Sequence, residues 1–456
     1  MSLIRRVLSA VLPRGAVLLS ALTFCGYVMG LLRDRTFAHT FGAGAELDTY
    51  NAALVLPELT LDILVVAGLQ AAFVPIFTGL RRRDPEAADA FGRTVLTTSI
   101  AIAVVALVAL FAVAPLTVSI VAPGFDAEHQ AVYAQLFRLM CVTMLIFAAS
   151  FALGEMLVSR QRFISYGLAP VLYNGGIVLG TVLLSSRIGI YGAAVGTVIG
   201  AFLHLGIRLL EVWRLHVPLR PALRVRAVAF REYVALALPK TLSQPIEPFT
   251  FLFFTSVASG LVAGSVSSVS FARNFQSVPV SLIGVAFSVA AFPVLSAAAA
   301  AGDRRGFIRQ TATNLVTISL VTTAAAVVLY AIATRVVDYF LAGEAFDAQD
   351  VTRTGLVLAA FTLSIPLESM THLLSRAIYA TRNTILPVAA SIAGLAVTVV
   401  TVELLVPSQG VVALPLGFAA GQGTKVVVLL WAVVVRARTV GGGVDRPTAV
   451  ASEAGA

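Results

Sequence analysis

Charged residues are scarce in this chain: of its 456 residues only 12% are Asp, Glu, Lys or Arg, where soluble domains carry roughly 25%. Cysteine and histidine are also rare, with two and five copies, so neither a disulfide framework nor a Cys/His metal site is expected. The sequence lacks a P-loop and the H-E-x-x-H and G-x-S-x-G motifs of hydrolases. These absences predict a protein that is not an enzyme and that uses no metal or cofactor.

Hydrophobic residues make up 58% of the chain, and the mean hydropathy is +0.93. They form long runs, and a run of about 20 residues is the length of a helix that crosses a membrane. The period-two alternation of barrel strands is not evident. We therefore expect an all-α integral membrane protein of about 12 transmembrane helices. The candidate spans are 15–33, 47–79, 95–121, 132–158, 163–185, 190–213, 231–260, 265–298, 311–336, 352–380, 384–406 and 410–435.

The net charge of +9 is spread in short arginine clusters between these spans. The clusters mark the N-terminus, the connections after the even-numbered spans and the start of the C-terminal tail, while most of the other connections are poor in arginine. Because basic connections lie on the cytoplasmic side, this pattern predicts that both termini are cytoplasmic. The scattered layout does not form a continuous basic face, so no nucleic-acid partner is expected.

Two segments recur at nearly equal offsets along the chain. "QAAFVPIFTGL" at 70–80 is echoed by "VAAFPVLSAAA" at 289–299, and "GLAPVLYNGG" at 167–176 by "TILPVAASIA" at 384–393. An even number of spans in each half makes such a repeat parallel. We expect two six-helix bundles around a central cavity, formed by residues 1–220 and 221–438. Residues 439–456 are expected to form a disordered cytoplasmic tail.

Several ionisable residues fall inside the spans, where a charge is costly and is expected to face the cavity or to find a partner. Glu58 and Asp62 are spaced i, i+4 and share one helix face, so they either hydrate the cavity or hold a cation or proton. Lys240 and Glu247 lie in "LPKTLSQPIEPF", where the prolines form either a static kink or a hinge, and Glu247 is a third candidate for the cation or proton. Lys425 is equally compatible with a salt bridge between helices and with a substrate contact.

The stretch "GLLRDRTFAHTFGAGAELD" at 30–48, with "QAAFVPIF" at 70–77, resembles the start of the MviN/MurJ family, the lipid II flippases of bacterial cell-wall synthesis. The matching residues include Arg33, Asp34 and Asp48. "VPVSLIGVAFSVAAFPVLS" and "AIYATRNTILP" carry a weaker similarity farther along the chain. The resemblance implies the multidrug/oligosaccharidyl-lipid/polysaccharide exporter fold in the bacterial cytoplasmic (inner) membrane. It also implies an undecaprenyl-diphosphate-linked sugar as substrate, whose diphosphate suits the paired donors of arginine.

The chain departs from the family pattern at several positions. It has Gly-Tyr at 26–27 where the family has Ser-Arg, and Leu-Asp at 61–62 where the family has an arginine pair. The family's arginine in span 8 aligns with Asn274, and the neighbouring Arg273 is turned from it by about 100° around a helix. We also count no spans that match the two additional C-terminal helices of typical members. A diverged member with a less cationic cavity is therefore expected.

Three functions are compatible with these observations. The first is a flippase that moves a lipid-linked oligosaccharide from the inner to the outer leaflet by alternating access, with membrane lipid as a partner and cell-wall or glycan synthesis enzymes as candidate partners. The second is an exporter of small molecules coupled to H⁺ or Na⁺, and the third is a non-transporting scaffold for envelope assembly. Arg33 and Asp34 are expected to lock the outer end of span 1, with Arg33 and Asp48 pairing in one gating state. The residues expected to bind substrate or to act in gating are Arg33, Asp34, Asp48, Arg273, Asn274, Lys240 and Lys425.

Overall fold

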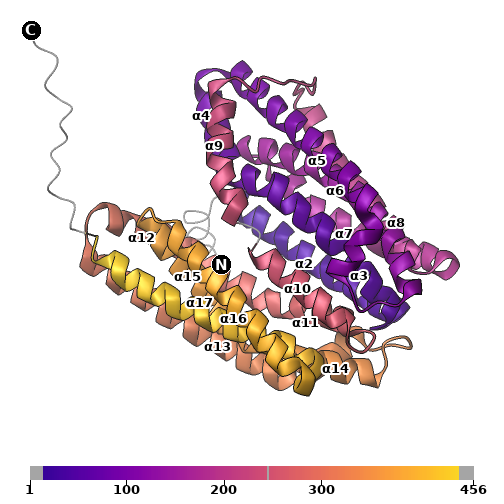
Figure 1. Ribbon diagram of the computed structural model, residues 1–456. Helices are drawn as coiled ribbons and strands as arrows, with labels where there is room; N and C mark the ends of the chain where they lie inside the picture. The colour runs from indigo at the N-terminus through magenta and orange to yellow at the C-terminus, as the bar shows by residue number, and fades with distance from the viewer. Residues whose placement is uncertain (1–13, 244–245, 441–456) are drawn as a thin grey trace, which may run out of the picture. The chain divides into compact units, whose positions relative to one another are not determined.

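The computed structural model describes residues 14–243 and 246–440, and every element of secondary structure in that part of the chain is a helix (Figure 1). The first six predicted spans correspond to six helical segments. These are α2 (Arg14–Phe41); the broken helix α3 (Ala45–Leu61), η1 (Asp62–Val66), η2 (Leu69–Phe73) and α4 (Val74–Arg83); α5 (Pro85–Val121); α6 (Ala127–Ser159); α7 (Phe163–Ile188); and α8 (Ile190–Arg214).

The last six predicted spans also correspond to six helical segments. These are α9 (Val228–Ser243) with α10 (Ile246–Ser259); α11 (Ser265–Pro279) with η3 (Val280–Val285) and α12 (Ala286–Ala300); α13 (Arg304–Leu341); α14 (Ala348–Thr362) with α15 (Ser364–Ala380); α16 (Ile385–Gln409); and α17 (Ala413–Ala437), preceded by η4 (Gly410–Val412). Apart from its first two residues, the predicted tail 439–456 lies outside the described residues.

The long helices leave apolar surface uncovered. Within the described residues, nine helical stretches are long and apolar enough to cross a membrane, and one of them contains both α16 and α17. In the most apolar windows of α5 and α13, only 22% and 17% of the residues are buried. A water-soluble protein rarely exposes apolar surface on that scale, so these faces are suited to lipid. The prediction of an all-α multi-pass membrane protein is confirmed.

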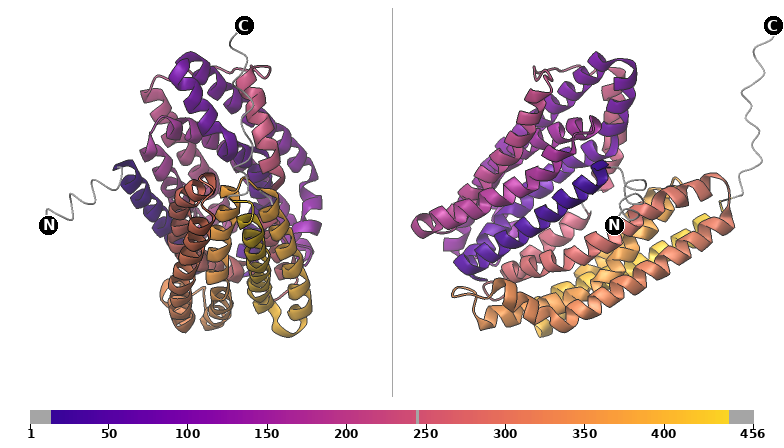
Figure 2. Two further views of the ribbon diagram at one scale, coloured as in Figure 1. Left: turned by 90° about the vertical axis from the view of Figure 1, so that its left-hand side faces the viewer. Right: turned by 180° about the vertical axis from the view of Figure 1, so that it is seen from behind.

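The chain forms two compact units. Unit 1 comprises Met1–Ser270 with Asp338–Val351, and unit 2 comprises Phe271–Val337 with Thr352–Ala456. In unit 1, α7 and α8 lie side by side, and in unit 2 α16 and α17 do so (Figures 1 and 2). The division of the chain into halves at residue 220 stays a prediction.

Glycines allow α7 and α8 to approach closely. A Cβ added to Gly176 would lie 2.4 Å from the backbone of Gly200, and one added to Gly180 would lie 2.2 Å from that of Gly196. Small residues at such spacing let two backbones pack together in a membrane, where helices gain little from burying apolar surface against each other rather than against lipid.

One π-helical turn of the first predicted half, η1, recurs at the equivalent position of the second, whereas η2 maps onto regular helix in α12. The offset of 219 residues, taken from the first repeated pair, maps η1 at 62–66 onto 281–285, and η3 occupies 280–285. π-Helical turns are rare and are found frequently at functional sites. Their recurrence at matching positions supports the interpretation that the two halves descend from one unit.

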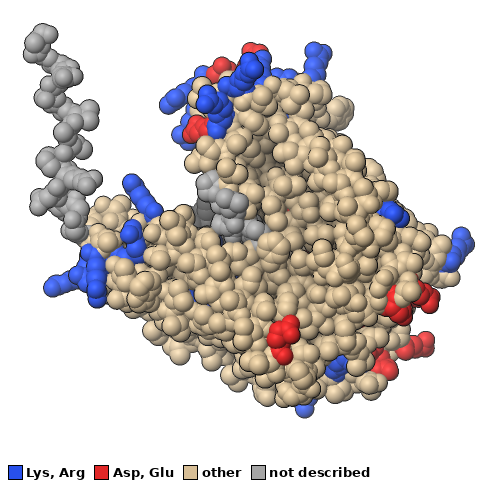
Figure 3. Space-filling model, in the orientation of Figure 1, with Lys and Arg blue, Asp and Glu red and all other residues tan. Residues whose placement is uncertain are grey.

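Charge is distributed unevenly over each unit (Figure 3). In unit 1, Lys and Arg gather, with a few Asp and Glu, over the end where α4 and the start of α9 lie, whereas acidic residues gather toward the opposite end. In unit 2, basic residues gather at the end next to α12. We call these basic ends the inner ends, following the predicted topology, and the opposite ends the outer ends.

Candidate functional site

Asp48, near the start of α3, is buried and caps the beginning of α11. Its Oδ2 accepts a hydrogen bond from the Gly264 amide at 2.7 Å, and its Oδ1 accepts from the amide and the hydroxyl of Ser267 at 2.7 and 2.6 Å. The first amides of a helix have no partner within the helix, and a carboxylate there also offsets the positive end of the helix dipole. Asp48 and Ser267 are 219 residues apart, which is the repeat offset. The second helices of the two predicted halves therefore meet at equivalent residues.

The glycine-rich segment before α3 binds the connection between α13 and α14. Nη1 of Arg35 donates to the carbonyls of Tyr339 and Phe340 at 3.1 and 2.8 Å, in the last turn of α13. The Ala43 amide donates to Oδ2 of Asp350 at 3.1 Å. Since a cation at a helix C-terminus is favourable, Arg35 stabilises the end of α13.

Gly42 is required by its backbone and by its surroundings. Its φ of +66° lies in the left-handed region, and an added Cβ would lie 2.1 Å from the carbonyl oxygen of Ala345. We call the set Arg35, Gly42, Ala43 and Asp48, with the partners given above, the outer clasp. The clasp explains why charge and glycine concentrate in this stretch, because the stretch ties together two connections distant in sequence.

Arg33 belongs to a second polar group in unit 1. Its Nε and Nη2 donate to Oδ1 of Asp34 at 3.0 and 2.7 Å, and its Nη1 donates to Oδ1 of Asn174 at 3.2 Å. Asp34 is almost fully buried, whereas the side chain of Arg33 is 25% exposed. The guanidinium is therefore held by the protein, while the side chain as a whole is partly exposed. Arg33 thus pairs with Asp34 and Asn174, while Asp48 binds α11.

Glu58 of α3 adds a carboxylate to the surroundings of Arg33. It interacts electrostatically with both Arg33 and Asp62, and Tyr50 and Tyr173 lie within the same group. The side chain of Glu58 is exposed in unit 1, and Asp62 is half-buried at the first residue of η1. Glu58 thus interacts electrostatically with both the partly exposed Arg33 and the second carboxylate, Asp62, within the membrane-spanning region.

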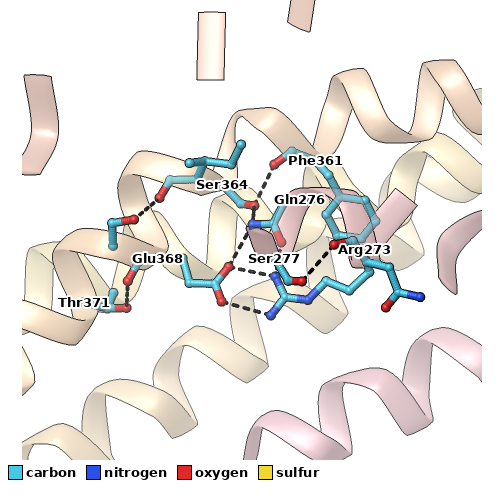
Figure 4. Close-up of polar contacts among 10 residues, drawn as sticks. Arg273, Gln276, Ser277, Phe361, Ser364, Glu368 and Thr371 are labelled. Atoms are coloured by element: carbon cyan, nitrogen blue, oxygen red, sulfur yellow. Dashed lines mark hydrogen bonds and ion pairs between the residues drawn. The ribbon is translucent and has the colours of Figure 1, made fainter. Parts of the chain in front are cut away.

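In unit 2, Arg273 of α11 forms a buried ion pair with Glu368 of α15 (Figure 4). Nη1 of Arg273 donates to Oε2 of Glu368 at 2.8 Å, and Nη2 donates to Oε1 at 2.9 Å. Gln276 accepts a hydrogen bond from Arg273 and donates to Oε2 of Glu368 at 2.9 Å and to Oγ of Ser364 at 3.0 Å. The ring of Phe418 lies 5.1 Å from the guanidinium carbon. The side chain of Glu368 is only 7% exposed. An anionic ligand would therefore have to compete with Glu368 for this arginine.

The other predicted site residues are dispersed. Asn274 is half-buried beside Arg273, and Lys425 is half-buried with its side chain against Gly394 of α16. Lys240 is half-buried near the end of α9, and Glu247 is exposed in the first turn of α10. Among the residues that the structure describes, no group of three or more His, Cys, Asp or Glu could hold a metal ion.

A buried polar group in unit 1 was not anticipated from the sequence. Arg208 of α8 is only 2% exposed and donates to the carbonyl of Ser150, and its guanidinium carbon lies 5.3 Å from the ring centre of Tyr166. One turn earlier, Nδ1 of His204 lies 2.8 Å from Oγ of Ser150. His204 and Arg208 are spaced i, i+4 within an otherwise apolar span, and that spacing could have predicted a shared buried face.

Comparisons of the sequence with known proteins agree with one another. A family model described as "Lipid II flippase MurJ" matches residues 37–445. The chain is 27% identical over 363 residues to the probable lipid II flippase MurJ of Thermotoga maritima, covering 79% of this chain and 72% of that protein. It is 25% identical over 355 residues to the probable lipid II flippase MurJ of Borreliella burgdorferi, covering 78% and 70%. It is 24% identical over 418 residues to the lipid II flippase MurJ of Burkholderia cenocepacia, covering 90% and 81%.

Solved structures share the fold. A lipid II flippase MurJ in an inward closed conformation superposes with a TM-score of 0.78 at 22% identity, over 93% of this chain and 90% of that one. An inward-facing multidrug resistance MATE transporter of the MOP superfamily superposes with a TM-score of 0.78 at 16% identity, over 94% and 99%. At these identities the similarity to solved structures shows the fold alone.

Proposed function

The chain belongs to the lipid II flippase MurJ family, and from that premise we propose that it moves an undecaprenyl-diphosphate-linked glycan precursor from the inner to the outer leaflet of the bacterial cytoplasmic membrane. The observation that carries the proposal is the family match from residue 37 to residue 445, which includes nearly every membrane-spanning helix. Both termini are cytoplasmic in this proposal, and the precursor need not be lipid II itself.

Arg33 is the residue best suited to meet the diphosphate. Its guanidinium is already oriented by Asp34 and Asn174, and the side chain as a whole is 25% exposed, so it is the partly exposed arginine of this polar group. Arginine donates hydrogen bonds in pairs to phosphate oxygens, and these charge-assisted bonds are short and strong. Within unit 2, Arg273 is proposed as a separate contact for an anionic group, available only where that group displaces Glu368.

The outer clasp is proposed as the gate that alternating access must open. Release of substrate to the outer leaflet requires α3 and α11 to separate at their outer ends, so Asp48 must give up its three hydrogen bonds to Gly264 and Ser267. Hydrogen bonds to a charged group are worth about 1.5–3 kcal/mol each. A clasp of this strength keeps the outer side closed until substrate binding supplies compensating free energy.

A second candidate function is export of a small molecule driven by H⁺ or Na⁺. The observation that favours it is the exposed carboxylate of Glu58 beside Asp62 in a membrane-spanning helix. In that case transport would depend on the ion gradient, and Glu58→Gln would abolish the dependence. In the flippase, the same substitution would reduce the local negative charge and leave lipid-linked substrate bound.

Complementation tests the proposal. The chain would be produced in a bacterium whose own lipid II flippase can be depleted, and the membranes would be examined for lipid-linked precursors accessible from outside. We expect growth to be restored, and native mass spectrometry of the purified protein to detect a polyprenyl-diphosphate glycan. Protein that reaches the membrane at normal levels, fails to restore growth and copurifies with no such glycan would contradict the proposal.

A further inference from the structure

A groove of about 410 Å³ runs between α4 and α9 in unit 1, outside both polar groups described above. Its apolar lining includes Ile76 and Leu80 from α4 and Val228 and Leu236 from α9, and Val228 and Leu236 are themselves 82% and 50% exposed. The lining spans nine residues of each helix, which corresponds to a length of about 12 Å between the first and last of them. Such a groove is long and apolar enough to hold part of a hydrocarbon chain.

Two charged side chains of opposite sign also line this groove. Arg83 is the last residue of α4, and Glu232 lies in the second turn of α9. Both side chains are exposed, and in the part of the chain that the structure describes neither makes an ion pair or a hydrogen bond with another residue. The groove lies at the inner end of unit 1, where basic residues gather (Figures 1 and 3). This is the level at which lipid headgroups meet the protein.

The opposite charges of Arg83 and Glu232 favour one class of lipid headgroup over others. A phosphate is attracted by Arg83, but a lipid with only a negative headgroup would also bring that charge close to Glu232. A headgroup that carries both a phosphate and an ammonium satisfies both side chains at once. Since the lining offers one cation and one carboxylate, charge complementarity favours a zwitterionic phospholipid whose ammonium can donate hydrogen bonds.

We propose that this groove binds a phosphatidylethanolamine molecule of the inner leaflet, with its phosphate at Arg83, its ammonium at Glu232 and one acyl chain along Ile76, Leu80 and Leu236. This site is separate from the Arg33 polar group, where the diphosphate of the transport substrate is proposed to bind. A bound phospholipid there holds α4 and α9 together at the inner membrane surface, so it stabilises unit 1 without entering the transport path.

Gly79 offers a way to fill the groove without disturbing the protein. It lines the groove, and a Cβ added there meets no atom within 4 Å, so Gly79→Leu occupies the space of the acyl chain. Leucine is also a better helix former than glycine. Gly206 of α8 is a matched control, because an added Cβ there also meets nothing within 4 Å and the residue lies outside the groove.

The test is lipid binding to the full-length protein in detergent, followed by native mass spectrometry. Dioleoyl phosphatidylethanolamine and dioleoyl phosphatidylglycerol are titrated separately, so that only the headgroup differs. We expect a two- to fivefold preference for phosphatidylethanolamine, the range of ratios that an exposed ion pair of up to about 1 kcal/mol gives. Glu232→Gln should reverse the preference in favour of phosphatidylglycerol.

The remaining variants separate a built site from general attraction. Arg83→Gln and Gly79→Leu should each lower binding of both lipids at least twofold, while the neighbouring Arg82→Gln and the control Gly206→Leu should bind as the wild type does. Equal binding of the two lipids by the wild type would overturn the proposal, as would an unchanged preference in Glu232→Gln or full binding in Gly79→Leu. None of these outcomes depends on transport, so a failure here leaves the proposed flippase function standing.

Discussion

Removing the charge of Glu368 should destabilise unit 2 through the arginine that it leaves behind. In Glu368→Gln, one amide oxygen replaces the two carboxylate oxygens that hold both terminal nitrogens of Arg273, whose side chain is only 18% exposed. Breaking a buried ion pair by removing one partner costs about 3–5 kcal/mol, because the remaining charge stays buried. Gln276 and the residual exposure of Arg273 reduce this cost, so we expect a loss of roughly 2–4 kcal/mol.

The assay is a double-mutant cycle read by thermal unfolding in detergent. Glu368→Gln and Arg273→Gln should each lower the midpoint by roughly 2–8 °C, since a change of 1 kcal/mol shifts the midpoint of a large chain by about 1–2 °C. Combining the two, in Arg273→Gln/Glu368→Gln, should cost less than the sum of the single losses because no unpaired charge remains. The exposed Glu403 of α16 provides the control Glu403→Gln, which should leave the midpoint within about 1 °C. Single losses that simply add in the double variant would refute the reasoning.

Three further predictions concern unit 1 and the transport path. Gly42→Ala should cost about 1–3 kcal/mol, measured by the unfolding midpoint, because its φ is +66° and a carbonyl oxygen occupies the space of the new Cβ. Hydrogen bonds from the backbone amide and the ring of His129 lower the pKa of Asp126, which caps the N-terminus of α6. The stability that this cap gives to the helix end is therefore fully present above the ordinary carboxyl pKa and is lost as the pH falls through the lowered pKa. Hydrogen exchange of the amides at 127–130, corrected for intrinsic rates, should report the loss. Arg33→Ala should impair complementation far more than Arg304→Ala, because Arg304 is an exposed residue at the start of α13, whereas Arg33 is held in a polar group within a membrane-spanning helix.

Each of these predictions has a control. Gly30→Ala adds a methyl group where nothing lies within 4 Å, so it should leave the midpoint unchanged, and an equal loss in both glycine variants would contradict the role of Gly42. Asp126→Asn removes the titrating group, so its exchange should no longer respond to acid. Equal growth with Arg33→Ala and Arg304→Ala would exclude Arg33 from the transport path.

The helices could be predicted from local sequence patterns, because a helix that crosses a lipid bilayer must be apolar over about 20 consecutive residues. Spans such as 95–121 and 311–336 are continuous apolar runs, and the structure has α5 and α13 there, with most of their apolar residues exposed. The repeat offset of 219 residues also relates η1 to η3, although no π-helical turn was predicted from the sequence. Apolar spans depend on residues that are neighbours in sequence, and a repeat depends on a fixed offset, so both can be recognised in a single sequence.

Partners distant in sequence could not be predicted in this way. Asn174 is 141 residues from Arg33, and Glu368 is 95 residues from Arg273, so composition and spacing do not indicate that either pair meets. Asp48 was expected to pair with Arg33 in one gating state, and that pairing stays a prediction; in this structure Asp48 binds the start of α11, because amides at a helix N-terminus attract a carboxylate as an arginine does. Which of these partners a side chain meets depends on how the helices pack against one another, and that packing is known only from the structure.

The most direct test of the central proposal is translocation by the purified protein. A fluorescent undecaprenyl-diphosphate glycan would be placed in proteoliposomes, and its appearance in the opposite leaflet would be followed with a membrane-impermeant quencher. We expect translocation with the wild type, little with Arg33→Ala, and the wild-type rate with Arg304→Ala. Correctly inserted wild-type protein that moves the glycan no faster than empty liposomes do would contradict the account.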